Sequence, residues 1–206
     1  ENPEYQLIKE YVFASHPARD DYIMNIFCIE RKGEAERISQ WAHLKNRMLL
    51  WHGSKVSNFM GILSQGLRIA PPEAPATGYM FGKGVYFADM FTKSLGYCTD
   101  DGTGYKLLLL CEVALGEMYE TEKAEYITEL KAPYKSVKGI GREGPKMSKK
   151  VVLSNGCICP IGKIVNYKKD QQQPFMWYGG LQHNEYIVYD VSQIRMRYLV
   201  QVKILS

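Results

Sequence analysis

The sequence predicts an α+β fold in which most strands pair antiparallel. A long apolar run at residues 107–115, interrupted only by Glu112, is typical of a central strand that is buried on both faces. Apolar and polar side chains alternate over residues 194–204, with Leu199 as the one exception, and this period of two indicates a strand with one buried face. The predicted strands do not alternate regularly with helices, which argues against a doubly wound parallel sheet.

Length and composition fit one ordinary globular domain. The chain has 206 residues, of which 46% are hydrophobic and 23% are charged, so it is long and apolar enough to bury its own core. These values argue against a disordered tail, and no apolar run reaches the roughly 18 residues that a membrane helix needs. The 26 cationic and 22 acidic side chains leave a formal charge of +4, which by itself is too small to indicate a nucleic-acid partner.

Local patterns predict the elements of the first third of the chain. Apolar residues at helical spacing predict helices, and short apolar runs rich in β-prone residues predict strands. In chain order these are a helix that follows Pro3 and carries residues 5–12, a strand at 22–29, a short amphipathic helix at 35–42, a buried strand at 48–51 and a helix at 56–63. Gly66 is expected to end the last of these helices, because glycine readily takes the conformation that follows a helix.

Residues 66–84 differ from their surroundings because prolines and glycines are frequent there. A loop of this length inside a compact domain is usually functional. A short strand at 85–88 follows, and Asp89 is expected to cap a helix at 91–97 through its side-chain oxygen. The sequence therefore predicts a long functional loop followed by a strand and a capped helix.

Residues 131–183 are rich in glycine, lysine and glutamine and are expected to form loops, with a hairpin at 154–156. Residues 139–144 match the G-x-G-x-x-G pattern of dinucleotide-binding folds, but Pro145 and a lysine-rich stretch stand where the helix of that fold should begin, so we predict a plain glycine loop. The stretch 135–150 holds six cations against one carboxylate. Two interpretations remain open for it, namely a solvated basic loop and a contact with DNA or another polyanion.

The cysteines do not suggest a disulfide framework. Five are scattered through the chain without C-x-x-C spacing, which favours free thiols in a reducing, intracellular compartment. Cys157 and Cys159 lack the second pair of ligands that a tetrahedral metal site needs, and residues two apart on a strand share one face. We therefore expect these two thiols to pack together in the core.

Polar residues stand at the ends of three apolar strands, where packing does not explain them. The sequence His52-Gly53-Ser54 follows the strand at 48–51, residues 82–89 close the proline- and glycine-rich loop, and Glu185 opens an apolar strand. Each has an ordinary interpretation when taken alone: a hydrogen-bonded core histidine, a core tyrosine at position 86 and a solvated glutamate at a sheet edge. Their combination carries the functional information.

Taken together, these segments resemble the catalytic domain of the poly(ADP-ribose) polymerases, and in particular the DNA-damage-responsive members. The resemblance rests on WHGS at 51–54, GILSQGLRIAPPEAP at 61–75, TGYMFGKGVYFADM at 77–90, KS and YC between 93 and 98, NEYIVYD at 184–190 and RMRYL at 195–199. It covers most of the chain and is weakest over residues 118–182.

The resemblance implies a single ADP-ribosyltransferase domain over residues 1–206, with two mostly antiparallel sheets packed together and short flanking helices. In the family this unit follows a helical regulatory domain and DNA-binding domains, which are absent from this sequence, so we expect high basal activity that does not need broken DNA. A nuclear location, no membrane, and DNA contact only through those further domains are also implied. The implied partners are NAD+, protein acceptors (the protein itself and histone-like proteins) and inhibitors that mimic nicotinamide.

The activity implied by the resemblance is transfer of ADP-ribose from NAD+, which serves as a co-substrate without a metal. Nicotinamide is released and poly(ADP-ribose) grows on proteins, as part of the DNA-damage response. The residues implied as catalytic are Glu185, His52, Tyr86 and Lys93. The residues implied in binding NAD+ are His52, Gly53, Ser54, Arg68, Tyr79, Tyr86, Ala88, Ser94 and Tyr97.

The chemistry of this reaction agrees with the residue types. Breaking the bond between ribose and nicotinamide builds positive charge at the anomeric carbon, which a fixed carboxylate such as Glu185 stabilises. A neutral amide is recognised well by a backbone donor and acceptor, which Gly53 leaves accessible, and its flat ring by tyrosines such as Tyr86 and Tyr97. A glutamate at position 185 favours polymer synthesis in this family. The alternatives are a mono-ADP-ribosyltransferase and an inactive module that binds NAD+ or ADP-ribose.

Overall fold

The structure is a computed structural model that describes residues 2–16, 22–71, 73–74, 78–99, 102–167 and 180–203. Its helices are short: α1 Pro3–Ser15, α2 Glu34–Ser39, α3 Phe59–Gln65 and α4 Phe91–Leu95, with 3-10 turns η1 Val56–Asn58 and η3 Val191–Gln193. α1 begins where the sequence predicts it, because the Asn2 side chain accepts a hydrogen bond from the backbone N–H of Glu4 at 2.9 Å and Pro3 fits the first turn. No helix within the described ranges is long and apolar enough to cross a membrane.

The largest sheet has six strands in the order β1-β13-β4-β2-β9-β8. Their bounds are β1 Ile23–Cys28, β13 Ile194–Lys203, β4 Tyr105–Ala114, β2 Arg47–Gly53, β9 Ile158–Cys159 and β8 Val151–Val152. All neighbours pair antiparallel except β2 and β9. β4 lies between β13 and β2 and is buried from Leu108 onward, which confirms the central strand predicted from its apolar run.

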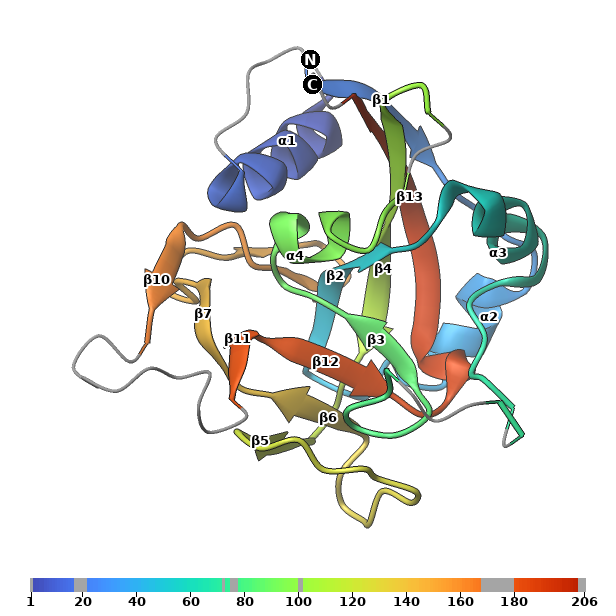
Figure 1. The fold of residues 1–206 in the computed structure, drawn as a ribbon, viewed down its shortest axis with the longest axis vertical. Coiled ribbons are helices and arrows are strands. Elements are labelled where there is room, and N and C mark those ends of the chain that lie inside the picture. The colour runs from blue at the N-terminus through green and yellow to red at the C-terminus, as the bar shows by residue number, and fades with distance from the viewer. Residues whose placement is uncertain are drawn as a thin grey trace.

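Two smaller sheets complete the fold. One has the order β3-β12-β6-β5 and the other β10-β7-β11. Their bounds are β3 Val85–Phe87, β12 Glu185–Val188, β6 Ser136–Gly139, β5 Met118–Thr121, β10 Ile164–Asn166, β7 Gly141–Pro145 and β11 Leu181–His183. Figure 1 shows the long strands β4 and β13 side by side, with β3, β12, β6 and β5 gathered towards one end of them. The predicted α+β class is confirmed, and a small third sheet accompanies the two that were expected.

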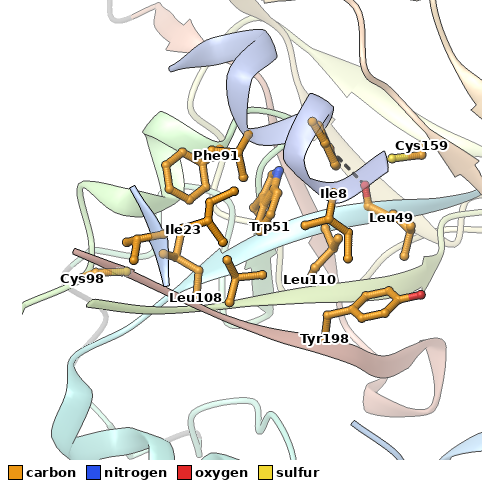
Figure 2. Close-up of a cluster of buried hydrophobic side chains, with 14 of the residues drawn as sticks. Ile8, Ile23, Leu49, Trp51, Phe91, Cys98, Leu108, Leu110, Cys159 and Tyr198 are labelled. Carbon is orange, nitrogen blue, oxygen red and sulfur yellow. Dashed lines mark hydrogen bonds between the residues drawn. The ribbon is translucent and has the colours of Figure 1, made fainter. Parts of the chain in front are cut away.

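The core lies on both faces of the large sheet. On one face, Ile8 and Tyr11 of α1 pack against Trp51 of β2, and the Tyr11 hydroxyl donates to the carbonyl of Leu49 at 3.0 Å. Figure 2 shows Trp51 between Ile8 and Phe91, whose ring centre is 5.3 Å from that of Trp51. On the other face, side chains of β2, β4 and β13 pack against those of β3 and β12. This second layer fixes the position of the smaller sheet that carries Glu185.

Most elements predicted for the first third of the chain are confirmed. The helix after Pro3, the strands at 22–29 and 48–51 and the helix that ends before Gly66 are all present, with slightly different bounds. α2 is shorter than the predicted 35–42 helix and ends at Ser39. Trp41 lies in the following turn, where its indole N–H donates to the Ser192 hydroxyl at 2.9 Å.

Predictions for the later part were wrong in two places. Asp89 does not cap α4, because Met90 is the N-cap residue and makes no side-chain capping bond. The segments 139–144 and 135–150 are not plain loops, since β6 and β7 run through them. These strands were not predicted because glycine and lysine have low β propensity and the pairing partners lie far away in the sequence. The hairpin at 154–156 is confirmed between β8 and β9, and both thiols of 157–159 are buried in one cluster.

Candidate active site

A pocket with a volume of about 270 Å³ opens where β2, β3, α4 and β12 meet. It is lined by His52, Gly53, Gly78, Tyr79, Met80, Tyr86, Phe87, Ala88, Lys93, Ser94, Tyr97 and Glu185. Figure 1 shows these four elements converging near the centre of the molecule. The pocket therefore gathers residues from all three strand ends that the sequence singled out.

The floor of the pocket is formed by close contact between β2 and α4. A Cβ atom on Gly53 would lie 1.9 Å from the carbonyl oxygen of Ser94 and 3.0 Å from the sulfur of Cys98. Any side chain at position 53 would push the two elements apart, so glycine is required there. This close approach brings Ser94 beside the backbone of Gly53, and both residues line the pocket.

His52 is fixed in one orientation by the backbone of β3. Its Nδ1 lies 2.8 Å from the carbonyl oxygen of Tyr86, and because a carbonyl can only accept, Nδ1 carries the proton. Burial lowers the pKa of this imidazole, partly offset by the bond to Tyr86. The neutral ring therefore keeps Nε2 as a hydrogen-bond acceptor, as a ligand hydroxyl would require.

Tyr86 presents its ring, not its hydroxyl, to the pocket. The hydroxyl donates to the carbonyl of Gly82 at 2.7 Å and accepts from the backbone N–H of Phe81 at 2.9 Å. Burial raises the pKa of this phenol, so it stays protonated. Gly82 has φ 84, and a Cβ there would lie 2.0 Å from the carbonyl oxygen of Ile127. The end of the long loop is therefore held at Gly82 by the hydrogen bond from Tyr86 and by close packing against Ile127.

Two further tyrosines extend the aromatic wall of the pocket. The ring centres of Tyr79 and Tyr86 are 6.2 Å apart. Tyr97 has 62% of its surface exposed to solvent. Aromatic faces arranged in this way can hold a flat heterocyclic ring. The exposed position of Tyr97 allows such a ring to enter without displacing a packed side chain.

A lysine holds the carboxylate of the pocket. Lys93 Nζ lies 2.8 Å from Glu185 Oε1 and also donates to the carbonyls of Asn184 at 2.9 Å and His183 at 3.3 Å. Burial lowers the pKa of Lys93, while Glu185 raises it. Three acceptors around one ammonium group favour its charged form and fix the Glu185 carboxylate. The second carboxylate oxygen, Oε2, is then the one best placed for a ligand.

Asp89 was missed as a site residue. It is 1% exposed, and its Oδ2 accepts from the Asn184 side-chain amide at 2.8 Å and from the Tyr186 hydroxyl at 3.0 Å. Asn184 in turn accepts from the backbone N–H of Gly141 at 2.9 Å. Burial raises the pKa of Asp89, and the two donors oppose that shift. In the sequence, Asp89 is an acidic residue directly after a predicted strand. We interpreted it as a helix cap, and so did not predict its contacts with Asn184 and Tyr186.

The structure separates two predicted residues from the pocket. Ser54 and Arg68 do not line it: the Ser54 hydroxyl accepts from the Asn58 side chain at 3.0 Å, and Arg68 is exposed. Gly78, Met80 and Phe87 line the pocket although the sequence did not single them out. Within the described ranges, no three His, Cys, Asp or Glu side chains come together in a way that could hold a metal ion.

The fold and the pocket define the class of protein. The packed sheets and the short flanking helices have the architecture of the ADP-ribosyltransferase fold, with the pocket at the meeting point of the large sheet, the sheet of β3 and β12, and α4. The chain belongs to the poly(ADP-ribose) polymerase catalytic domain family, whose family model matches residues 2–204.

Curated relatives agree with this assignment. The chain is 50% identical to "Poly [ADP-ribose] polymerase 2" of Zea mays, over 98% of this chain and 31% of that protein. It is 51% identical to "Poly [ADP-ribose] polymerase 1" of Danio rerio, over 97% of this chain and 19% of that protein. A Drosophila melanogaster "Poly [ADP-ribose] polymerase" is 44% identical over 97% of this chain and 20% of that protein. The chain thus spans 19–31% of the length of these relatives.

Proposed function

We propose that this chain is a catalytic unit that transfers ADP-ribose from NAD+ to protein acceptors and then extends the product into poly(ADP-ribose). The observation that carries the proposal is the Glu185 carboxylate, held 2.8 Å from Lys93 at the edge of a pocket whose floor is Gly53. The family and the printed names of the relatives support polymer synthesis.

In this proposal the nicotinamide ring lies on the pocket floor between Tyr86 and Tyr97. Its carboxamide pairs with the backbone of Gly53 and with the hydroxyl of Ser94, both of which line the pocket. His52 accepts a hydrogen bond from the adenosine ribose through Nε2, because Nδ1 is committed to Tyr86. Flat, neutral amides fit such a site because it supplies aromatic faces and uncharged polar groups.

The reaction breaks the bond between the anomeric carbon of ribose and the nicotinamide nitrogen, and nicotinamide leaves with the bonding electron pair. An acceptor oxygen bonds to the anomeric carbon, and its proton passes towards Glu185. The carboxylate stabilises the positive charge that develops on the ribose and polarises the attacking hydroxyl. Lys93 positions this carboxylate and lies at the side from which an acceptor would approach.

The remaining residues belong to the same proposal. Tyr79 and Ala88 line the pocket. Arg68 is proposed to reach NAD+ after the long loop adjusts, and Ser54 after its hydroxyl leaves Asn58. The reaction needs no metal, since the developing charge is met by a carboxylate. We propose that the chain is one catalytic domain that works in the nucleus, and its five free thiols favour a reducing compartment.

The test is incubation of the purified chain with NAD+ labelled in the adenine, followed by gel analysis and an assay of free nicotinamide. A high-molecular-weight smear with nicotinamide release is expected. Glu185→Gln should lower chain extension by about 10²–10⁴, whereas the exposed Glu120→Gln should leave it unchanged. A single discrete band would show mono-transfer, and full polymer from Glu185→Gln would refute the assigned role. NAD+ binding without label or nicotinamide would indicate an inactive binding module.

A further inference from the structure

The net positive charge of the chain is concentrated in one segment. Residues 144–167 contain four lysines and no aspartate or glutamate. The remaining 182 residues contain 22 cationic and 22 acidic side chains, so they carry no formal net charge. The +4 charge of the whole chain therefore comes from this segment, which includes half of the basic stretch noted in the sequence.

The four lysines, Lys146, Lys149, Lys150 and Lys163, form one surface, which we name the lysine patch. β7 and β10 pair antiparallel, which places Lys146 opposite Lys163, and the N–H of Lys146 donates to the carbonyl of Lys163 at 3.0 Å. A turn closed by the N–H of Lys149 and the carbonyl of Lys146, 2.9 Å apart, brings the other two lysines beside them. All four residues are exposed.

Carboxylates in the described part of the chain do not neutralise the lysine patch. Among the described residues, no acidic side chain forms an ion pair with any of its four lysines. The nearest glutamate along β7, Glu143, faces His183 of β11 at 3.9 Å instead. Exposed lysines that make no ion pair within the described residues can bind a flexible anion through their ammonium groups.

The patch is connected to the catalytic carboxylate by one strand. β7 begins at Gly141, whose N–H donates to the side chain of Asn184, the residue before Glu185. The strand ends at Pro145, next to Lys146. Five residues at about 3.3 Å each span roughly 17 Å, so Lys146 lies about that far from the contact between Gly141 and Asn184. Figure 1 shows β7, β10 and β11 together at one side of the molecule.

We propose that the lysine patch binds the growing poly(ADP-ribose) chain, which rests on the proposed function. Each added unit brings a pyrophosphate with two negative charges, and the polymer grows from an acceptor beside Glu185. Because the polymer is attached to an acceptor at the active site, its phosphates have a high effective concentration near the patch. Free DNA is not held there in this way. Lysine–phosphate contacts do not read base identity, so they suit a uniform repeating polyanion.

The test measures binding of purified, protein-free poly(ADP-ribose) as a function of salt. We compare the unmodified chain with a patch variant, Lys146→Gln with Lys149→Gln, Lys150→Gln and Lys163→Gln. One lysine–phosphate contact to a single strand contributes roughly 0.7 to the steepness with which the logarithm of the binding constant falls with log salt concentration. If each of the four lysines binds one phosphate, this slope should be smaller by about 3 in the patch variant. The control variant replaces four exposed lysines elsewhere, Lys32, Lys45, Lys123 and Lys131, by glutamine, and its slope should change by less than about one.

Activity assays separate this inference from the proposed function. The patch lies outside the pocket, so the patch variant should release nicotinamide at the rate of the unmodified chain but make shorter polymers. An equal loss of binding in both variants would show an effect of net charge and overturn the proposal. Polymers of unchanged length from the patch variant would also overturn it. A failure of the unmodified chain to release nicotinamide would refute the proposed function, while polymer binding is still measured directly.

Discussion

A buried carboxylate behind the pocket holds the residues on either side of Glu185. Asp89 Oδ2 accepts from Asn184 and Tyr186, which precede and follow Glu185 in the chain. The carbonyl of Asn184 also accepts from Lys93, which pairs with Glu185. Asp89 is therefore a positioning residue, since it fixes the strand that carries the carboxylate and the lysine that orients it.

Asp89→Ala is expected to lower both stability and activity. It leaves two buried donors without an acceptor, at roughly 1–3 kcal/mol each, and relief of the buried charge offsets part of this, so a loss of about 2 kcal/mol or more is expected in urea unfolding. The rate of nicotinamide release should fall more than the KM for NAD+ changes, because the carboxylate is misplaced. Tyr186→Phe removes a single donor and should cost about 1 kcal/mol. Unchanged stability of Asp89→Ala would contradict this role.

His52 should make NAD+ binding sensitive to pH. Its pKa in the folded protein is lowered by burial, so it lies below the ordinary value of about 6.5. The neutral form is present above that range, and as the pH falls through the lowered pKa a proton on Nε2 removes the acceptor. Folding stability from the neutral ring is lost in the same direction.

We therefore expect the KM for NAD+ to rise only once the pH falls below the ordinary imidazole range, measured by initial rates of nicotinamide release at each pH at which the protein stays folded. His43→Gln, a change of an exposed histidine, should keep the same pH profile. A KM that rises already above pH 6.5, or that does not rise at any pH at which the protein stays folded, would contradict the proposed acceptor role of Nε2.

The strand-end pattern in the sequence predicted much of the pocket. His52, Tyr86 and Glu185 were singled out because polar or aromatic residues at the ends of buried strands are hard to explain by packing, and all three line the cavity. Ser54 belongs to the same motif as His52 but bonds Asn58, because the chain turns away after β2. Asp89 was misread because a local capping rule fits the sequence as well as a contact with residues almost a hundred positions away.

At the scale of elements, the contact between β2 and α4 sets the depth of the pocket. The Ser94 carbonyl occupies the space that a side chain on Gly53 would need. Gly53→Ala should therefore displace α4, lower NAD+ affinity by at least about tenfold, and destabilise the fold by roughly 1–3 kcal/mol through overpacking.

The matched control is Gly61→Ala, in α3, where nothing lies within 4 Å of the added atom. Alanine is the better helix former, so this change should stabilise the protein by about 0.5–1 kcal/mol and leave NAD+ binding unaltered. Thermal unfolding and NAD+ titration measure both effects. An unchanged NAD+ affinity in Gly53→Ala would contradict the prediction, because it would show that α4 can move without weakening NAD+ binding.

A buried glutamate holds the turn of the β8–β9 hairpin against the central strands of the large sheet. Glu112 of β4 is 1% exposed and pairs with Arg47 at 2.9 Å and Arg197 at 3.2 Å. Its second oxygen also accepts from Asn155, in the hairpin turn, at 3.2 Å. One carboxylate therefore connects β4, β2, β13 and the turn.

Glu112→Ala leaves two partly buried guanidinium groups without a counter-charge, and roughly 3 kcal/mol of stability should be lost. Amide hydrogen exchange should also speed up in the hairpin, where the N–H of Leu153 bonds the carbonyl of Cys157. Glu120→Ala breaks a surface pair with Lys138 at 3.5 Å and should cost at most about 1 kcal/mol. Equal losses from the two changes would contradict the anchoring role.

The C-terminal strand shows what periodicity can and cannot predict. The alternation predicted β13 correctly, but the register shifts between Met196 and Tyr198. Met196 packs with the layer that faces β3 and β12, whereas Tyr198 packs on the α1 side, so the strand changes the face that it buries. Leu199, the exception in the alternation, contacts the layer that Met196 joins. Alternation alone does not reveal such a shift, because both faces of the sheet are covered.

At the scale of the whole molecule, the reactivity of the buried thiols should measure how often the protein unfolds. Cys28 is exposed, while Cys98, Cys111, Cys157 and Cys159 are buried in the two layers on either side of the large sheet. Burial raises the pKa of Cys98 to about 11 and that of Cys157 to about 12. At pH 8 these thiols are protonated and out of reach, so they are unreactive in the folded state.

A thiol-reactive dye at pH 8 should therefore label one cysteine quickly and the other four only as the protein unfolds, because both layers must open to expose them. Cys28→Ser should abolish the fast phase and leave the slow phase intact. Gly53→Ala should selectively speed the labelling of Cys98, since the added atom would lie 3.0 Å from its sulfur and would loosen its surroundings. Mass spectrometry of labelled peptides identifies each site. Fast labelling of any second cysteine in the unmodified chain would show that one layer opens without the other.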